Sequence, residues 1–419
     1  MKSGTEDSLR LKAIDLFGGL NICKVLETIN SHQFMPKAAL DQIRQERLKE
    51  LFQVAQKTTD YYAAFKSLDE VPVLTKDIIQ QNPNAFISSS YKKKLFKKAT
   101  GGSTGVTLNY FGSVSTQSYL WAGLIHSWKI AGYQCGDRVA FISGSALIKS
   151  DFMHGIFYKL LNVKAYDAFA IDEKSIGHFI ADIIETRASI IFGYAMVMSL
   201  VADYIHAKKN ILFPHLKGII CTSEVLTDVM RKNIENAFGV KVYNQYGCHD
   251  AGVMAFECEH QQMHLLSTRT VYELDNNGRF TSTDLENDAF IFMKYDTGDI
   301  VTFSNDECTC GRKYPVISKI LGRSNDIIID MDHKKLHSNI FNIMFRKDPS
   351  IHQFQILFDH ESFALYLAVD NSKPHMEYNR IMEEIKRMLH FNAYEIVINA
   401  PFIKACNAKH RYIINTTNH

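Results

Sequence analysis

The chain has 419 residues, more than one hydrophobic core usually serves, so two or three packed units are expected. Hydrophobic residues make up 46% and charged residues 22%, which is typical of a soluble globular enzyme and excludes disordered and fibrous proteins. The net charge of +2 gives no global field that would attract nucleic acid or an acidic membrane, so neither is an expected partner.

The first ten residues are polar and charged, without the apolar stretch of a secretion signal. No apolar run approaches the roughly 18 residues that a membrane-spanning helix needs. We therefore expect a cytoplasmic protein, in which the eight cysteines are reduced unless they bind a metal.

Residues 1 to about 90 are predicted to be helical, since Leu40, Ile43, Leu48 and Leu51 recur at helix spacing. Thr75 follows a proline-containing break and is expected to cap a short helix.

From about residue 96 to 303, short apolar runs alternate with helical patterns. Residues 138–142, 189–192 and 218–221 are predicted strands, and helices are expected after the last two of them. Continuous apolar strands that alternate with helices favour a mainly parallel α/β sheet with both faces covered.

The last hundred residues follow another pattern. Residues 354–358 and 363–369 alternate like paired antiparallel strands, and a helix over about 376–389 precedes a strand at 395–398. The predicted fold class is α/β, with a large N-terminal body of mainly parallel sheets over residues 1–322. A small, mobile α+β C-terminal lid domain is predicted over residues 323–419.

A loop rich in glycine and hydroxyl residues is the first chemical signal. Consecutive glycines expose backbone amides to an anion, and flanking hydroxyls add donors. The loop lacks the Gly-Lys-Ser/Thr ending of a P-loop NTPase. The residues expected to hold phosphate are Thr100, Gly101, Gly102, Ser103, Thr104 and Gly105.

This loop resembles the phosphate loop of the adenylate-forming superfamily, in particular that of phenylacetate–CoA ligases and the related CapK-type capsule-biosynthesis proteins. Val106-Thr-Leu108 stands where the superfamily commonly has a proline and a lysine. The resemblance covers roughly residues 70 to 419 and implies ATP and Mg²⁺ as cofactors.

Two further segments resemble motifs of the same family. Ser223 and Glu224 match the pair that borders the adenine. In Tyr246-Gly-Cys-His-Asp250, the resemblance implies that Tyr246 packs on the base, that Gly247 permits its close approach, and that Asp250 helps to hold Mg²⁺. Asp250 replaces the usual glutamate and is one methylene shorter, although it can still bind Mg²⁺ directly or through water.

Tyr295-Asp-Thr-Gly-Asp299 matches the ribose motif, in which Asp299 accepts both ribose hydroxyls. Gly322-Arg-Ser-Asn-Asp326 matches the hinge motif. There the resemblance implies that Arg323 contacts the ribose or phosphates and that Asp326 is the pivot.

Ala408-Lys-His-Arg411 is similar to the terminal Gly-Lys-x-Arg of the family, with alanine in place of glycine. Lys409 would be the lid lysine that enters the site. The chemistry needs such a cation, because the attacking carboxylate and the α-phosphate are both anionic. The catalytic residues implied are Lys409, Asp250 and Arg323.

A separate set of cysteines and histidines suits tetrahedral Zn²⁺. Its members are Cys258, His264, Cys308 and Cys310, with His260 as an alternative fourth ligand. The alternative is a group of unrelated buried thiols. A closed set of four ligands would leave no position for substrate, so the metal would be structural.

The predicted function is ATP-dependent activation of an aryl or other organic acid to an acyl-adenylate, with release of pyrophosphate. Transfer to a thiol (coenzyme A or a carrier protein) or to an amine follows, and Phe141 and Tyr194 are expected in the acid pocket. The competing hypothesis is a degenerate, non-catalytic relative that binds nucleotide and acts as a pathway partner.

Overall fold

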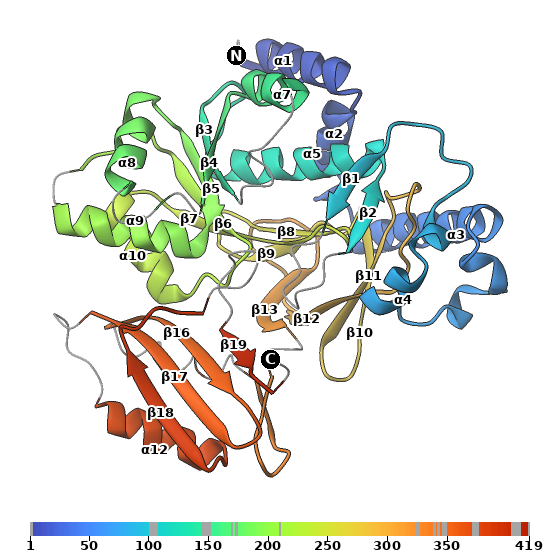
Figure 1. Cartoon of the computed structure of the whole chain (residues 1–419). Coiled ribbons are helices and arrows are strands. Elements are labelled where there is room, and N and C mark those ends of the chain that lie inside the picture. Colours follow the sequence, from blue (N-terminus) through green and yellow to red (C-terminus); the bar gives the residue numbers. More distant parts are fainter. Residues whose placement is uncertain are drawn as a thin grey trace.

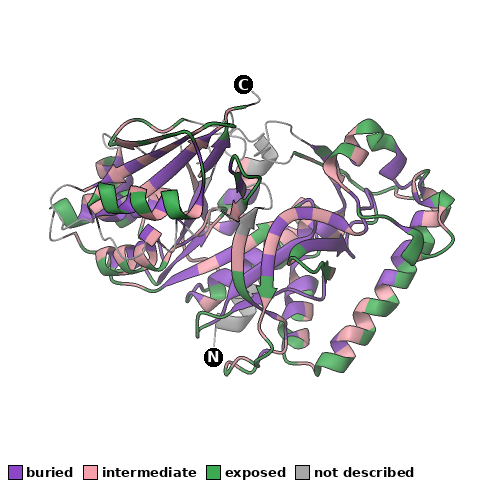
Figure 2. Cartoon of the chain, turned by 90° about the horizontal axis from the view of Figure 1, so that it is seen from below, coloured by how far each residue is buried: buried purple, intermediate pink, exposed green. Residues whose placement is uncertain are grey.

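The computed structural model of the chain describes residues 3–99, 108–143, 152–168, 171, 175–208, 211–323, 327–337, 341, 344–345, 350–370, 377–403 and 412–417. They form a large body around an eleven-stranded sheet and a smaller C-terminal part around a four-stranded sheet (Figure 1). The strands of both parts are largely buried, while the helices expose their outer faces (Figure 2). Three apolar clusters stabilise the body, and a separate one stabilises the C-terminal part.

Helices begin the chain, as predicted. Their bounds are α1 (Ser3–Gly18), α2 (Ile22–His32), α3 (Lys37–Thr58) and α4 (Lys76–Gln81). The Asp15 carboxylate accepts the backbone amides of Ile22 and Cys23 at 2.6 and 2.9 Å, so α1 caps the start of α2. Thr75 is the N-cap residue of α4, but its side chain makes no capping hydrogen bond.

The large sheet is mixed. In spatial order its strands are β4 (Val163–Asp167), β3 (Val139–Ser143), β5 (Ile190–Tyr194), β6 (Gly218–Thr222), β7 (Val242–Cys248), β8 (Val253–Glu257), β9 (Met263–Leu265), β13 (Val316–Arg323), β12 (Tyr295–Phe303), β11 (Arg279–Asp284) and β10 (Thr270–Leu274). The strands from β4 to β7 pair in parallel, and those from β7 to β10 pair antiparallel. The α/β class is confirmed, but the mainly parallel sheet is corrected to one that is parallel at one end only.

Helices cover both faces of the parallel end. They are α5 (Val114–Ile130) and α7 (Phe152–Leu161), which lie with α1 and α2, and α8 (Ile176–Glu185), α9 (Ala195–Lys208) and α10 (Asp228–Phe238) on the other face. Side chains alternate between the faces along a strand, so Ile190 and Phe192 pack with α5 whereas Ile191 packs with α9.

A hairpin of β1 (Phe96–Ala99) and β2 (Asn109–Gly112) brackets the predicted phosphate loop. Ala99 pairs with Asn109, so the two ends of the loop are held together. Residues 100–107, which include the predicted phosphate-binding residues, lie outside the described part of the chain.

The C-terminal part is an α+β unit, as predicted. It contains β16 (Ile351–Phe358), β17 (Ser362–Val369), α12 (Tyr378–Met388), β18 (Ala393–Ile398) and β19 (Ile413–Asn415), preceded by the short hairpin β14 (Ile327–Ile329) and β15 (Lys335–His337). β16 and β17 pair antiparallel, and β18 and β19 add in parallel at the two edges. The domain boundary at residues 322 and 323 stays a prediction.

None of the helices in the described ranges combines the length and apolar character needed to cross a membrane.

Gly252 offers a direct test of packing in the body. Its φ is +68°, and a Cβ there would lie 2.3 Å from Cγ of Asp284, which is held by Arg269. We expect Gly252→Ala to lower the free energy of unfolding by about 1–3 kcal/mol more than Gly239→Ala does. Gly239 has a similar φ of +72° but open space around it. Its substitution therefore measures only the cost of placing alanine in a left-handed backbone conformation. Equal losses in urea denaturation would contradict this packing argument.

Candidate active site

The motif residues of the parallel end lie at the carboxyl ends of neighbouring strands. Tyr194 ends β5 and pairs with Thr222, which ends β6 and pairs in turn with Gln245 of β7. Ser223 and Glu224 follow β6 directly, and Tyr246 follows Gln245. In open α/β sheets this edge is where ligands bind.

A strained turn follows β6. Ser223 has a φ of +69°, a left-handed conformation that costs a non-glycine residue about 1–3 kcal/mol and often marks a functional site. Glu224 turns back towards α9, where its Oε2 accepts the backbone amide of Met196 at 2.9 Å. The turn therefore fixes this edge of the site against the first turn of α9.

Two hydrogen bonds join the end of β7 and the turn after it to the first residues of β12, and we call this pair the tyrosine–aspartate clasp. The Tyr246 hydroxyl donates to Oδ2 of Asp299 at 2.6 Å, and the Tyr295 hydroxyl donates to Oδ2 of Asp250 at 2.7 Å. Each segment has a tyrosine four residues before its aspartate, so each gives one hydroxyl and one carboxylate. The structure thus brings the predicted adenine, metal and ribose residues together.

Asp250 lies in a largely buried turn. Besides the bond from Tyr295, its Oδ1 accepts the Cys248 thiol at 3.0 Å. Tyr110 of β2 lies near enough that burial, together with the charge of Asp250, raises the pKa of the Tyr110 hydroxyl well above its usual value. The hairpin that brackets the phosphate loop therefore lies beside this carboxylate.

The turn that carries Asp250 packs against residues of β11. The Ser282 hydroxyl donates to the backbone carbonyl of Ala251 at 2.8 Å, and Gly252 leaves room for Asp284. Asp284 is in turn fixed by Arg269, with both side chains almost fully buried. A buried, hydrogen-bonded ion pair of this kind is a rigid support, because removing either partner leaves an uncompensated charge.

The ribose and hinge motifs meet through their backbones. Asp299 of β12 pairs with Arg323 of β13. Gly298, with a φ of +74°, lies within β12 where its pairing with β11 shifts register, so the backbone is irregular just before Asp299. Gly247 of β7 is exposed. Asp326 and Lys409 lie outside the described residues.

Phe141 lies in the core of the parallel end. It is buried on the α5 face of the sheet, stacked on Phe192 at 4.8 Å with Trp128 beside it. Its place in the acid pocket stays a prediction. Tyr194 is half-buried at the carboxyl edge and stays a candidate.

The predicted metal residues do come together. One ligand atom from each of Cys258, His264, Cys308 and Cys310 lies within 4.8 Å of all the others. The Cys258 and Cys308 sulfurs are 3.7 Å apart, and Cys310 Sγ lies 3.4 Å from Nε2 of His264. Tetrahedral zinc with bonds of about 2.3 Å to sulfur and 2.0–2.1 Å to nitrogen would place such atoms about 3.8 and 3.5 Å apart. A disulfide would need about 2.05 Å.

The surroundings orient His264 as a ligand. Its Nδ1 lies 3.3 Å from the backbone carbonyl of Tyr314, to which it can donate, and this leaves the Nε2 lone pair facing Cys310. Burial lowers the pKa of His264 to about 4, so the ring is neutral near pH 7. His260 is not part of the cluster, since its Nδ1 lies 2.6 Å from the Thr309 hydroxyl.

The loop that carries two of these cysteines also anchors the N-terminal helices. Arg312 makes two bonds to Glu259, at 2.6 and 2.9 Å, and donates from Nε to the side chain of Gln33 at 2.8 Å. These bonds from Arg312 lower the pKa of Glu259 to about 2. Gln33 follows α2, so the cysteine loop holds the junction of α2 and α3.

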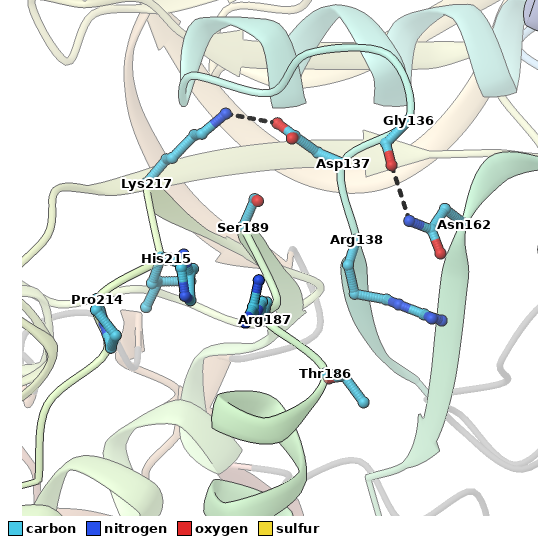
Figure 3. A pocket seen from close by; sticks show the side chains of 11 residues that line it. Gly136, Asp137, Arg138, Asn162, Thr186, Arg187, Ser189, Pro214, His215 and Lys217 are labelled. Carbon is cyan, nitrogen blue, oxygen red and sulfur yellow. Dashed lines mark hydrogen bonds and ion pairs between the residues drawn. The ribbon is translucent and has the colours of Figure 1, made fainter.

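A pocket of about 550 Å³ lies at the amino ends of the parallel strands, away from the motif residues at their carboxyl ends (Figure 3). Its walls are the turns that precede β3, β4, β5 and β6, with Lys217 bonded to Asp137 and Asn162 to the Gly136 carbonyl. None of the motif residues lines it. Chemistry therefore assigns the candidate site to the carboxyl edge of the sheet.

Comparisons with known proteins agree with the motif order. No protein-family model matches the chain. CapK of Staphylococcus aureus is 24% identical over 388 residues, which cover 84% of this chain and 83% of CapK. Phenylacetate–coenzyme A ligase of Thermus thermophilus is 29% identical over 130 residues, which cover 27% of this chain and 29% of that enzyme.

Among solved structures, 2-hydroxyisobutyryl-CoA ligase is similar in fold. In its postadenylation state it matches with a TM-score of 0.72 and 17% identity, covering 92% of both chains. In its thioesterification state the TM-score is 0.56, with the same coverage and 18% identity.

The chain is thus similar in sequence to CapK and, over a shorter stretch, to a phenylacetate–CoA ligase. Its fold is similar to that of 2-hydroxyisobutyryl-CoA ligase.

The sequence argument missed Tyr295 and Cys248, the two residues that hold Asp250. A signal was present for Tyr295, because the spacing from tyrosine to aspartate is the same in both segments of the clasp. For Cys248, closeness in sequence to Asp250 was the only signal.

We expect Arg312→Met to lower the free energy of unfolding by about 2 kcal/mol, since it removes three hydrogen bonds from a buried guanidinium. The neighbouring Lys313→Met should cost less than about 1 kcal/mol, because its partner Glu307 is highly exposed. Urea denaturation compares the two. Similar losses of free energy in the two variants would show that the hydrogen bonds of Arg312 contribute little to stability.

Proposed function

We propose that this protein activates a carboxylic acid with ATP. An oxygen of the acid attacks the α-phosphorus, the bond from that phosphorus to pyrophosphate breaks, and an acyl-adenylate remains. A nucleophile then attacks the acyl carbon and AMP leaves.

The tyrosine–aspartate clasp is the observation that carries this proposal. It places Asp250 and Asp299 on facing segments beside Tyr246 and the hairpin of the phosphate loop. Asp299 would accept the ribose hydroxyls, and Tyr246 with Ser223 would border the adenine. Asp250 would hold Mg²⁺, which neutralises phosphate charge when bound.

The C-terminal part would act as the lid. Segment 100–107 contains no lysine or arginine, so a cation for the transition state must come from elsewhere, and we assign this role to Lys409. The Tyr412 hydroxyl lies 4.0 Å from Met196 Sδ, beside Glu224, so the lid contacts this edge of the site. The higher TM-score to the postadenylation state than to the thioesterification state supports a lid placed for the first half-reaction.

The acceptor we propose is the thiol of coenzyme A. The support is that 2-hydroxyisobutyryl-CoA ligase, which has a similar fold, was crystallised with 2-HIB-AMP and coenzyme A. Carrier-protein thiols and amines are the alternative acceptors, and the amide bond synthetase of Marinactinospora thermotolerans, with a TM-score of 0.54, has a similar fold. Arg323 and Asp326 would contact the nucleotide and act as the hinge, respectively.

The proposal predicts pyrophosphate release when ATP, Mg²⁺ and a suitable acid are supplied. Lys409→Ala should reduce the rate about 10²–10³-fold, because it removes charge stabilisation from the transition state. Lys386→Ala, in the exposed face of α12, is the matched control and should leave the rate unchanged. A coupled pyrophosphate assay with aryl and alkyl acids, with and without coenzyme A, measures both.

The competing hypothesis, a non-catalytic nucleotide-binding relative, predicts another outcome. The protein would bind ATP in calorimetry but release no pyrophosphate with any acid of the panel. That result would replace the enzyme proposal.

We also propose that Cys258, His264, Cys308 and Cys310 hold a structural Zn²⁺. The support is the agreement of their spacings with a tetrahedral site and the orientation of His264 by Tyr314. The metal would fix the loop between β12 and β13 and, through Arg312, the junction of α2 and α3.

Elemental analysis of the purified protein should therefore find about one zinc per chain. Cys310→Ser should remove most of it and lower the thermal midpoint, whereas Cys135→Ser, a cysteine distant from the cluster, should change neither. A metal-free protein whose Cys308 and Cys310 alkylate readily would contradict the proposal.

A further inference from the structure

We infer that Tyr295 is a positioning residue for the Asp250 carboxylate, which it holds in one orientation so that its remaining lone pairs can bind a divalent cation. This inference rests on the proposed function, since it assigns the cation to Asp250. The hydrogen bond from the Cys248 thiol to Oδ1 of Asp250 helps to hold the carboxylate in the same orientation.

Tyr295 is held rigidly. It is fully buried at the start of β12, and its ring stacks on Phe292 at 5.4 Å. Its backbone is fixed from both sides, because Lys294 accepts the amide of Leu74 and Asp296 donates to the carbonyl of Leu74. The position of its hydroxyl is therefore set by the core and does not depend on the ligand.

The hydroxyl of Tyr295 can act only as a donor to the carboxylate. A carboxylate only accepts hydrogen bonds, so across the 2.7 Å between the two oxygens the Tyr295 hydroxyl is the donor. A bond from a neutral donor to an ionised carboxylate is stronger than one between neutral groups.

The count of lone pairs leaves room for a metal. A carboxylate offers about four acceptor positions, and Tyr295 and Cys248 occupy one on each oxygen. Among the residues that the structure describes, no other donor takes the second position on either oxygen. Because aspartate has one side-chain torsion fewer than glutamate, these two bonds suffice to fix where those lone pairs point.

A purely structural role makes a different prediction. If Tyr295 only satisfies its own buried hydroxyl, Tyr295→Phe would change stability but not cation affinity. Tyr62 is the matched control, since it is also fully buried and, within the described part of the chain, its hydroxyl bonds to the backbone of Ile291 and Met293 and to no carboxylate.

The experiment measures Mn²⁺ binding by electron paramagnetic resonance, with the full chain saturated with α,β-methylene ATP. We expect Tyr295→Phe to weaken Mn²⁺ about tenfold, the size typical of losing a group that orients a metal ligand. Tyr62→Phe should bind Mn²⁺ with nearly the affinity of the unchanged protein. Asp250→Asn should lose the part of the Mn²⁺ affinity that the protein contributes. Equal affinity for the two phenylalanine variants, or an unaffected Asp250→Asn, would overturn the inference.

A second pair of variants covers the case in which Tyr295→Phe does not fold. Cys248→Ala removes the other donor and should weaken Mn²⁺, whereas Cys248→Ser keeps a donor and should restore binding. No difference between these two variants would overturn the inference.

Failure of the proposed function is a separate result, because Mn²⁺ binding needs no turnover. Absence of pyrophosphate release together with the expected Mn²⁺ shifts would reject the enzyme but keep the positioning role. Normal release with equal Mn²⁺ affinities would reject the positioning role alone.

Discussion

The candidate site depends on the tyrosine–aspartate clasp between residues 246–250 and 295–299. Burying a carboxylate is costly unless donors compensate for the lost water, and each tyrosine here supplies one. Each segment gives a hydroxyl donor to the aspartate of the other. If either segment moved, the carboxylate of the other would therefore lose its hydrogen bond. Three strands, β13, β9 and β8, separate β7 from β12 in the sheet, so the clasp can form only because the sheet curves.

The cysteine–histidine cluster and the clasp lie at opposite ends of one hairpin. β12 runs from the clasp to the loop that carries Cys308 and Cys310, and β13 returns to Arg323 beside Asp299. Register shifts between β12 and β13 show that backbone pairing alone leaves this hairpin irregular. The proposed zinc would fix the loop and so constrain the position of Asp299, although none of its ligands would touch substrate.

The motifs and the helix–strand alternation could be predicted because they are local. The helix expected after residues 218–221 appears as α10, with Thr227 as its cap, and the four candidate metal ligands converge as expected. The antiparallel half of the sheet was missed, and at β9 the reason is length, since three residues are too few for a period to show. The face on which a strand residue such as Phe141 lies depends on a shift of one position, which the sequence pattern does not determine. The pairing within the clasp depends on sheet curvature, which the sequence does not reveal.

The distribution of charge explains why the C-terminal part is needed. The site gathers two carboxylates, Asp250 and Asp299, and would receive the further negative charge of ATP and an acid. Segment 100–107 offers backbone and hydroxyl donors but no cation. In the proposed function, a metal on Asp250, Arg323 beside Asp299 and Lys409 of the C-terminal part would supply the positive charge. The metal would offset charge on the phosphates, and the lysine would offset charge between the attacking carboxylate and the α-phosphate.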